Sequence, residues 1–227
     1  ERGVLMPGVL VTGGAGFIGS HLLQALLARG EQVVCLDNFD PFYPREYKLR
    51  NLAEVGASAA LTFVEGDLRE GELVARLMAQ HRPAVVYHLA AKAGVRPSLA
   101  APAEYVAVNV TGTVNLLQAA AETGVQRFIF ASSSSVYGAA NTLPFSEEQD
   151  VLRPLSPYAA TKVAGEAFCH TYHHLHGLPV VALRFFTVFA SGVRRNSRYG
   201  PTPAAERSAG WSVRVCDTIV GSGDCGW

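Results

Sequence analysis

The stretch that decides the fold is "VLVTGGAGFIGSHLLQALLARG", residues 9–30. It opens with a β-branched, apolar run and continues through Gly13, Gly16 and Gly19 into an amphipathic helical pattern. Glycines permit a tight turn and a close approach of the backbone to a pyrophosphate, and the helix N-terminus offers free N–H groups to the anion. The spacing is G-x-x-G-x-x-G, and a glycine triplet alone also fits a plain structural turn. The strand before it and the helix after it favour a dinucleotide site.

Two acids follow neighbouring strand patterns. Asp37 ends "VVCLD", 18 residues after Gly19. A carboxylate there can accept hydrogen bonds from an adenosine ribose and would repel a 2′-phosphate, which favours NAD over NADP. A solvated acid at a strand end is the alternative reading of Asp37. Asp67, in "EGDLRE", suits a contact near the adenine, and a helix N-cap is an equally good interpretation.

Short apolar runs alternate with longer helical patterns along most of the chain. This alternation indicates βαβ units, and the nearly continuous apolar strands indicate a sheet covered on both faces. We therefore predict an α/β fold, a doubly wound (Rossmann) parallel sheet with helices on both faces. The expected strands are Val9–Thr12, Gln32–Asp37, Leu61–Glu65, Ala84–Leu89, Arg127–Ser132 and Pro179–Phe185. The expected helices are Phe17–Arg29, Glu46–Val55, Glu70–Gln80, one near Pro102–Thr123, and Pro157–His176.

Composition narrows the class of protein. The 227 residues suffice for one large domain or two small ones, and 49% are apolar. Lys plus Arg and Asp plus Glu both number 19, and this neutral balance argues against a nucleic-acid surface. No apolar run reaches the length of a membrane span, and no leader pattern is seen at the N-terminus. The four cysteines form no C-x-x-C pair, so reduced thiols in a cytoplasmic protein are expected. No metal site is expected, because His170 and His174 lack an acidic or cysteine partner at ligand spacing.

The regular pattern stops near Phe189. The sequence divides into a dinucleotide-binding domain, residues 1–188, and an atypical segment, residues 189–227, rich in Gly, Ser, Pro and Arg. The latter has at most one strand-like run, Ser212–Val215. We expect this segment to be disordered or read out of frame, to pack poorly on the sheet, and to leave Trp211 and Trp227 exposed.

Tyr158 and Lys162 lie four residues apart in "PLSPYAATKVAGEAFCH", residues 154–170. On a helix this spacing puts both side chains on one face. The bare Tyr-x-x-x-Lys pattern also arises by chance, so the pair alone does not establish chemistry.

Several motifs in order resemble the extended short-chain dehydrogenase/reductase family, specifically its NAD-dependent nucleotide-sugar epimerases and dehydratases. The matching pieces are "TGGAGFIGSHL", "LDNFDPFYPREYK", "HLAAKAGVRPSL", "NVTGTVNLLQAA", "FIFASSSSVYG", "PYAATKVAGE" and "LRFFTV", within residues 8 to 188. The second and third look most like UDP-glucuronate 4-epimerases. Relatives continue with a C-terminal substrate region whose motifs are not matched after Phe189, so this domain is expected to be largely missing.

The resemblance implies roles for individual residues. Tyr158 would be the acid–base group, Lys162 would hold the nicotinamide ribose and lower the pKa of Tyr158, and Ser133 would bind the sugar O4, although Ser132 and Ser134 lie near enough to confuse that assignment. The expected cofactor contacts are Gly13, Gly16, Phe17, Ile18, Gly19, Asp37, Asn38, Asp67, Leu68, Leu89, Ala90, Ala91, Lys92, Tyr158 and Lys162. The expected substrate contacts are Val95, Arg96, Ser133, Ser134 and Thr187.

The reaction implied is C4 epimerisation of a nucleotide sugar, UDP-glucuronate or UDP-galacturonate, through a transient 4-keto sugar. Dehydratases of the family carry an Asp-Glu pair where this chain has Ser134 and Ser135, which disfavours dehydration. A reductase of the same family and a non-catalytic NAD-binding fragment remain open alternatives. The helices near 102–123 and 157–176 resemble those that pair in family homodimers.

Overall fold

The computed structural model describes residues 8–139, 143–188 and 215–220. Its centre is a seven-stranded sheet in the order β3-β2-β1-β4-β5-β6-β7. The first six strands are parallel, and β7 pairs with β6 in the antiparallel direction. The strand order reverses between β1 and β4, and in doubly wound sheets the ligand sits outside the carboxyl ends of the strands at that point.

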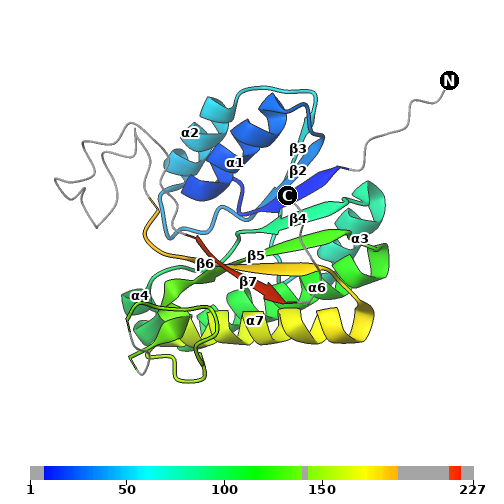
Figure 1. The fold of residues 1–227 in the computed structure, drawn as a ribbon. Coiled ribbons are helices and arrows are strands. Elements are labelled where there is room, and N and C mark those ends of the chain that lie inside the picture. Colours follow the sequence, from blue (N-terminus) through cyan, green and yellow to red (C-terminus); the bar gives the residue numbers. More distant parts are fainter. Residues whose placement is uncertain (1–7, 140–142, 189–214, 221–227) are drawn as a thin grey trace.

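Helices cover both faces of the sheet, as the sequence predicts. Figure 1 shows α1 and α2 on one face, with α3, α6 and α7 on the other. The strands are β1 (Val9–Thr12), β2 (Val33–Asp37), β3 (Leu61–Glu65), β4 (Val85–His88), β5 (Arg127–Ser133), β6 (Val180–Phe185) and β7 (Val215–Val220). The α-helices are α1 (Phe17–Ala28), α2 (Arg45–Val55), α3 (Gly71–His81), α4 (Val95–Ala100), α5 (Pro102–Val106), α6 (Gly112–Thr123) and α7 (Pro157–His176).

Alternate residues of each central strand enter two separate cores. Leu10 of β1 packs in the cluster beneath α3, α6 and α7, whereas Val9 and Val11 join the cluster beneath α1. A strand buried on both faces needs apolar residues at every position, which explains the continuous apolar runs. Among the described residues, no helix is long and apolar enough to cross a membrane.

The structure differs from the predicted elements in three regions. The helix expected near Pro102–Thr123 is α5 and α6 joined by a π-helical turn, Ala107–Thr111. The short helix α4 was not predicted, since its six residues carry no helical apolar pattern. A 3₁₀ turn, Ser134–Tyr137, follows β5, which itself extends one residue further than predicted, to Ser133.

Most of the segment after 188 lies outside the described residues, including Trp211 and Trp227. The exception is β7, whose bounds replace the strand-like run predicted at Ser212–Val215. Its pairing with β6 runs from Val180 opposite Val220 to Phe185 opposite Val215, so six residues of a segment expected to pack poorly on the sheet lie at its edge. The backbone of β6 would otherwise leave a row of unpaired N–H and C=O groups at the sheet edge. The disorder or altered reading frame expected for the rest stays a prediction.

Candidate active site

A cavity of about 140 Å³ lies at the carboxyl ends of β1, β2 and β4. It is at the point where the strand order reverses, as predicted for a dinucleotide. Its walls include ten of the residues expected to contact the cofactor: Gly13, Gly16, Asp37, Asn38, Asp67, Leu68, Leu89, Ala90, Ala91 and Lys92.

The glycine loop is packed too closely for a side chain at two of its three glycines. Gly13 has φ +73°, and a Cβ there would come within 2.8 Å of the backbone nitrogen of Ala90. A Cβ on Gly19 would overlap the carbonyl oxygen of Gly13, so this glycine lets α1 pack against the loop. At Gly16, among the described residues, a Cβ would meet only that same oxygen, at 3.1 Å. The loop therefore leaves open space at the start of α1, where Phe17 and Ile18 begin the helix.

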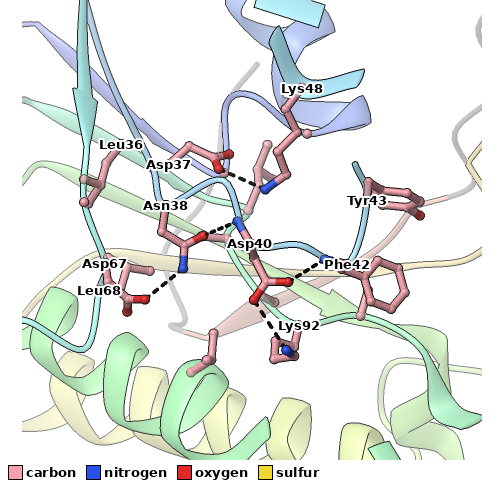
Figure 2. A pocket seen from close by; sticks show the side chains of 18 residues that line it. Leu36, Asp37, Asn38, Asp40, Phe42, Tyr43, Lys48, Asp67, Leu68 and Lys92 are labelled. Carbon is pink, nitrogen blue, oxygen red and sulfur yellow. Dashed lines mark hydrogen bonds and ion pairs between the residues drawn. The ribbon is translucent and has the colours of Figure 1, made fainter. Parts of the chain in front are cut away.

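Asp37 is buried at the end of β2 and is not the solvated acid of the alternative reading. Its Oδ2 accepts from the backbone N–H of Ala15, at 3.1 Å, and its Oδ1 accepts from that of Phe39, at 2.9 Å. Lys48 of α2 also donates to Oδ1, at 3.0 Å, and is itself buried. Figure 2 shows this ion pair at the cavity wall. Sequence reasoning missed Lys48, because no local pattern links a lysine on α2 to an acid 11 residues earlier.

A second pair of hydrogen-bonded side chains, Asn38 and Asp67, lines the cavity below this ion pair (Figure 2). The Asn38 amide donates to Asp67 at 2.8 Å, and the pKa of Asp67 is lowered to about 2, chiefly by its hydrogen bond from Arg69. Asp67 is not a helix N-cap, since α3 begins at Gly71 after the N-cap residue Glu70. That alternative reading is therefore wrong, and Asp67 remains a wall of the cavity.

Lys92 ties the loop after β2 to α5. Its ammonium is 3.4 Å from Asp40 and 2.7 Å from Glu104. Its backbone N–H donates to Asn109, whose amide donates in turn to Thr161 of α7 at 3.0 Å. The cavity wall is thus connected by hydrogen bonds to the helix that carries Tyr158.

Ser133, Tyr158 and Lys162 come together beyond this cavity wall, between the end of β5 and the start of α7. Ser156 caps α7, its hydroxyl accepting from the backbone N–H of Ala159 at 3.1 Å. Tyr158 follows in the first turn, close enough to Ser133 for that side chain to lower the pKa of the phenol. Lys162 lies one turn later, buried, and donates to the carbonyl of Ala131 at 2.7 Å.

Burial controls the titration of this group of residues. It raises the pKa of Tyr158 above its usual value, and the nearby Ser133 side chain lowers that pKa by less. Burial also lowers the pKa of Lys162, to about 8. The expectation that Lys162 lowers the pKa of Tyr158 is not met by the protein's own residues, because the Lys162 ammonium is directed to the backbone of β5.

Ser132 and Ser133 have different surroundings in the structure. Ser132 donates to Glu166 of α7, which also receives two hydrogen bonds from Arg184 of β6, at 3.0 and 2.8 Å. Ser132 is therefore held inside this buried network, which sequence reasoning missed. Ser133 instead meets Tyr158 and the Ser135 hydroxyl, 3.2 Å away. Of Ser132 and Ser133, it is therefore Ser133 that lies near the tyrosine, and its binding of the sugar oxygen stays a prediction.

The predicted substrate contacts are more dispersed. Val95 and Arg96 lie exposed on α4, and Thr187 is exposed after β6. Ser134 is half-buried in the 3₁₀ turn next to Ser133. None of these four lines the cavity, and neither do Tyr158 and Lys162. The cavity thus fits the adenosine part of a dinucleotide rather than the reacting part.

Comparisons with known proteins agree with this geometry. UDP-glucuronate 4-epimerase 1 of Arabidopsis thaliana is 46% identical over 192 residues, which are 84% of this chain and 44% of that protein. A UDP-glucuronic acid 4-epimerase from Bacillus cereus, solved with UDP-glucuronic acid and NAD, matches with a TM-score of 0.73 at 39% identity. The match covers 81% of this chain and 57% of that one. A Thermus thermophilus UDP-glucose 4-epimerase, solved with NAD, matches with a TM-score of 0.71 at 39% identity, covering 85% and 58%.

The chain spans about half the length of the curated relatives it matches. The match to the family model covers residues 9–209 and so includes the glycine loop, the cavity, and the Tyr158 and Lys162 pair. The predicted fold class and the predicted cofactor, NAD, are both confirmed. The chain belongs to the NAD dependent epimerase/dehydratase family.

Proposed function

We propose that this chain carries the NAD-binding and proton-transferring part of a nucleotide-sugar 4-epimerase, with UDP-glucuronate and UDP-galacturonate as its substrate pair. The observation that carries the proposal is the meeting of Ser133, Tyr158 and Lys162 at the carboxyl end of β5. The relatives named UDP-glucuronate 4-epimerase support the choice of sugar.

Bound NAD would supply the hydride acceptor for the sugar carbon and return the hydride afterwards. The glycine loop and Asp37 would hold its pyrophosphate and adenosine ribose. Tyr158 would take the proton of the sugar 4-hydroxyl and give it back, with Ser133 holding the sugar oxygen. Because burial raises the pKa of Tyr158, a positive charge must lie near the phenol before it can act as a base near neutral pH. Lys162, on the same helix face, would supply that charge if its ammonium turned from the Ala131 carbonyl toward the phenol when NAD and the sugar bind.

The Ser132–Glu166–Arg184 network supports this assignment. It fixes β5, α7 and β6 to one another at the strand ends next to Ser133. Positions held this rigidly suit a site whose reacting groups must keep their geometry through two proton transfers.

The test is conversion of UDP-glucuronate by the purified chain with NAD, followed by chromatography. We expect UDP-galacturonate to form, and Tyr158→Phe to abolish it while NAD still binds. The alternative is a chain that binds NAD without turnover. NAD binding without any UDP-galacturonate would establish that alternative and overturn the proposal.

A homodimer through the helices near 102–123 and 157–176 stays a prediction. These helices expose Val106 on α5 and Leu175 on α7, at 49% and 66% of the residue surface. Sedimentation velocity should give a dimer, and a Leu175→Glu variant should shift it to the monomer. The cytoplasmic location is likewise still a prediction.

A further inference from the structure

The buried ion pair between Asp37 and Lys48 carries an inference about cofactor choice, and it rests on the proposed binding of NAD. Both residues line the cavity, and their side chains are only 4% and 11% exposed. The Lys48 ammonium lies 3.0 Å from Asp37 Oδ1 (Figure 2). A lysine side chain is rarely this buried unless its charge is paired.

The hydrogen-bonding capacity of Asp37 is mostly used by the protein. Oδ1 accepts from Phe39 and Lys48, which fills both of its lone-pair directions, and Oδ2 accepts from Ala15. One acceptor position on Oδ2 is therefore left for a ribose hydroxyl. A ribose presents two neighbouring hydroxyls, so Asp37 alone can serve only one of them.

Lys48 can serve the other. An ammonium has three N–H donors, and among the described residues the hydrogen bond to Asp37 is the one it makes. We propose that Lys48 binds the adenosine ribose together with Asp37, and that its ammonium becomes a 2′-phosphate site once Asp37 is removed. Asp37 thus favours NAD in two ways: it accepts from a hydroxyl, and it neutralises the lysine that would otherwise attract NADP.

The charges around the cavity support this division of roles. Its lining contains three carboxylates, Asp37, Asp40 and Asp67, and two ammonium groups, Lys48 and Lys92. Lys92 is already paired with Asp40 and Glu104. A 2′-phosphate, which carries about two negative charges, would therefore meet an excess of carboxylates in the native cavity. Without Asp37, Lys48 is the lysine released from its partner.

The test is calorimetric titration of the full 227-residue chain with NAD and NADP, with 5′-AMP and 2′,5′-ADP as probes of the adenosine half. The variants are Asp37→Ser, Lys48→Met and the two combined. Asp40→Ser is the matched control, because it also removes one cavity carboxylate but leaves Lys48 paired with Asp37 and Lys92 paired with Glu104. Asp37→Asn keeps the side-chain shape and replaces Asp37→Ser if circular dichroism shows that the serine variant is unfolded.

We expect the native chain to prefer NAD, and Lys48→Met to weaken NAD binding without any gain for NADP. Asp37→Ser should raise the affinity for NADP by about tenfold, and adding Lys48→Met should remove that gain. Asp40→Ser should leave the preference unchanged. Equal NADP affinity of Asp37→Ser with and without Lys48, or an equal gain in Asp40→Ser, would overturn the inference while leaving NAD binding intact. A native chain that bound neither nucleotide would overturn the proposed function as well.

Discussion

Acidification should destabilise this chain through His88. The side chain is 1% exposed at the end of β4, directly before the cavity residues Leu89 and Ala90. Its Nε2 lies 2.8 Å from the Thr113 hydroxyl, which itself donates to the carbonyl of Asn109. Thr113 can therefore only accept from His88, so Nε2 carries a proton.

The other ring nitrogen completes the chain of hydrogen bonds. Nδ1 accepts from the Thr12 hydroxyl at 2.8 Å, and that hydroxyl accepts from the backbone N–H of Ala90 at 3.2 Å. A second proton on His88 would thus remove an acceptor that holds the end of β1 to the cavity wall. Burial lowers the pKa of His88 from 6.5 to about 3, and the nearby charge of Lys162 contributes a smaller part.

The sign and the size of the effect follow from linkage. The unfolded chain takes up a proton at His88 below about pH 6.5, whereas the folded chain does not until about pH 3. Stability is therefore present above pH 6.5 and is lost as the pH falls, with a limiting slope of about 1.4 kcal/mol per pH unit. Between pH 6.5 and 4.5 this one residue should cost about 2 kcal/mol of the free energy of unfolding.

The effect is measured by urea unfolding at about pH 6.5, 5.5 and 4.5, which lie between the unfolded and folded pKa values of His88. His88→Gln should be less stable than the wild type at pH 6.5, because it loses buried hydrogen bonds, and the gap should shrink by about 2 kcal/mol at pH 4.5. His174→Gln, which removes an exposed imidazole from α7, is the control and should show no such convergence. Parallel stability curves for the wild type and His88→Gln would refute the buried, neutral state of His88.

Three further predictions concern α7. Tyr158→Phe should lower turnover by about 100-fold or more while NAD affinity, measured by calorimetry, stays unchanged, and a smaller loss would contradict its acid–base role. Lys162 has its pKa lowered to about 8, so wild-type stability should rise by about 3 kcal/mol between pH 8 and 10.5, as the unfolded chain alone holds that proton. Urea unfolding of Lys162→Met should show no such rise. If the variant gained as much stability over this pH range as the wild type, Lys162 would not be the group responsible. Gly165→Ala should destabilise the fold by about 1–3 kcal/mol, because the added methyl would overlap the ring of Phe130. The control is Gly71→Ala, whose methyl would make only ordinary contact with Asn115, at 3.5 Å, on the exposed start of α3. Equal thermal unfolding of these two glycine variants would count against tight packing of α7 on β5.

The features whose position in the fold was predicted from the sequence each depend on a few residues that are adjacent in the chain. The glycine loop, the acid at the end of β2 and the Tyr158–Lys162 pair each depend on a strand end or on one helical turn. The strands of the sheet and the helices around it were also predictable, because the spacing of apolar residues differs between a strand and a helix.

The missed features depend on residues that only the tertiary fold brings together. Lys48 reaches Asp37 from another element, and Glu166 meets Ser132 and Arg184 from two different strands. No periodicity in the chain signals such contacts. The π-helical turn at Ala107–Thr111 was also hidden, because one extra residue in a helix barely changes its apolar pattern.

In the proposed reaction, a hydride leaves the sugar carbon and returns to it, and Tyr158 takes and gives back the proton. The most direct measurement is the mass and NMR spectrum of the product formed from UDP-glucuronate by the chain and NAD in deuterated water. We expect UDP-galacturonate with no deuterium on any sugar carbon, because the hydride never exchanges with solvent. Deuterium at a ring carbon, or a dehydrated product, would contradict the proposed reaction.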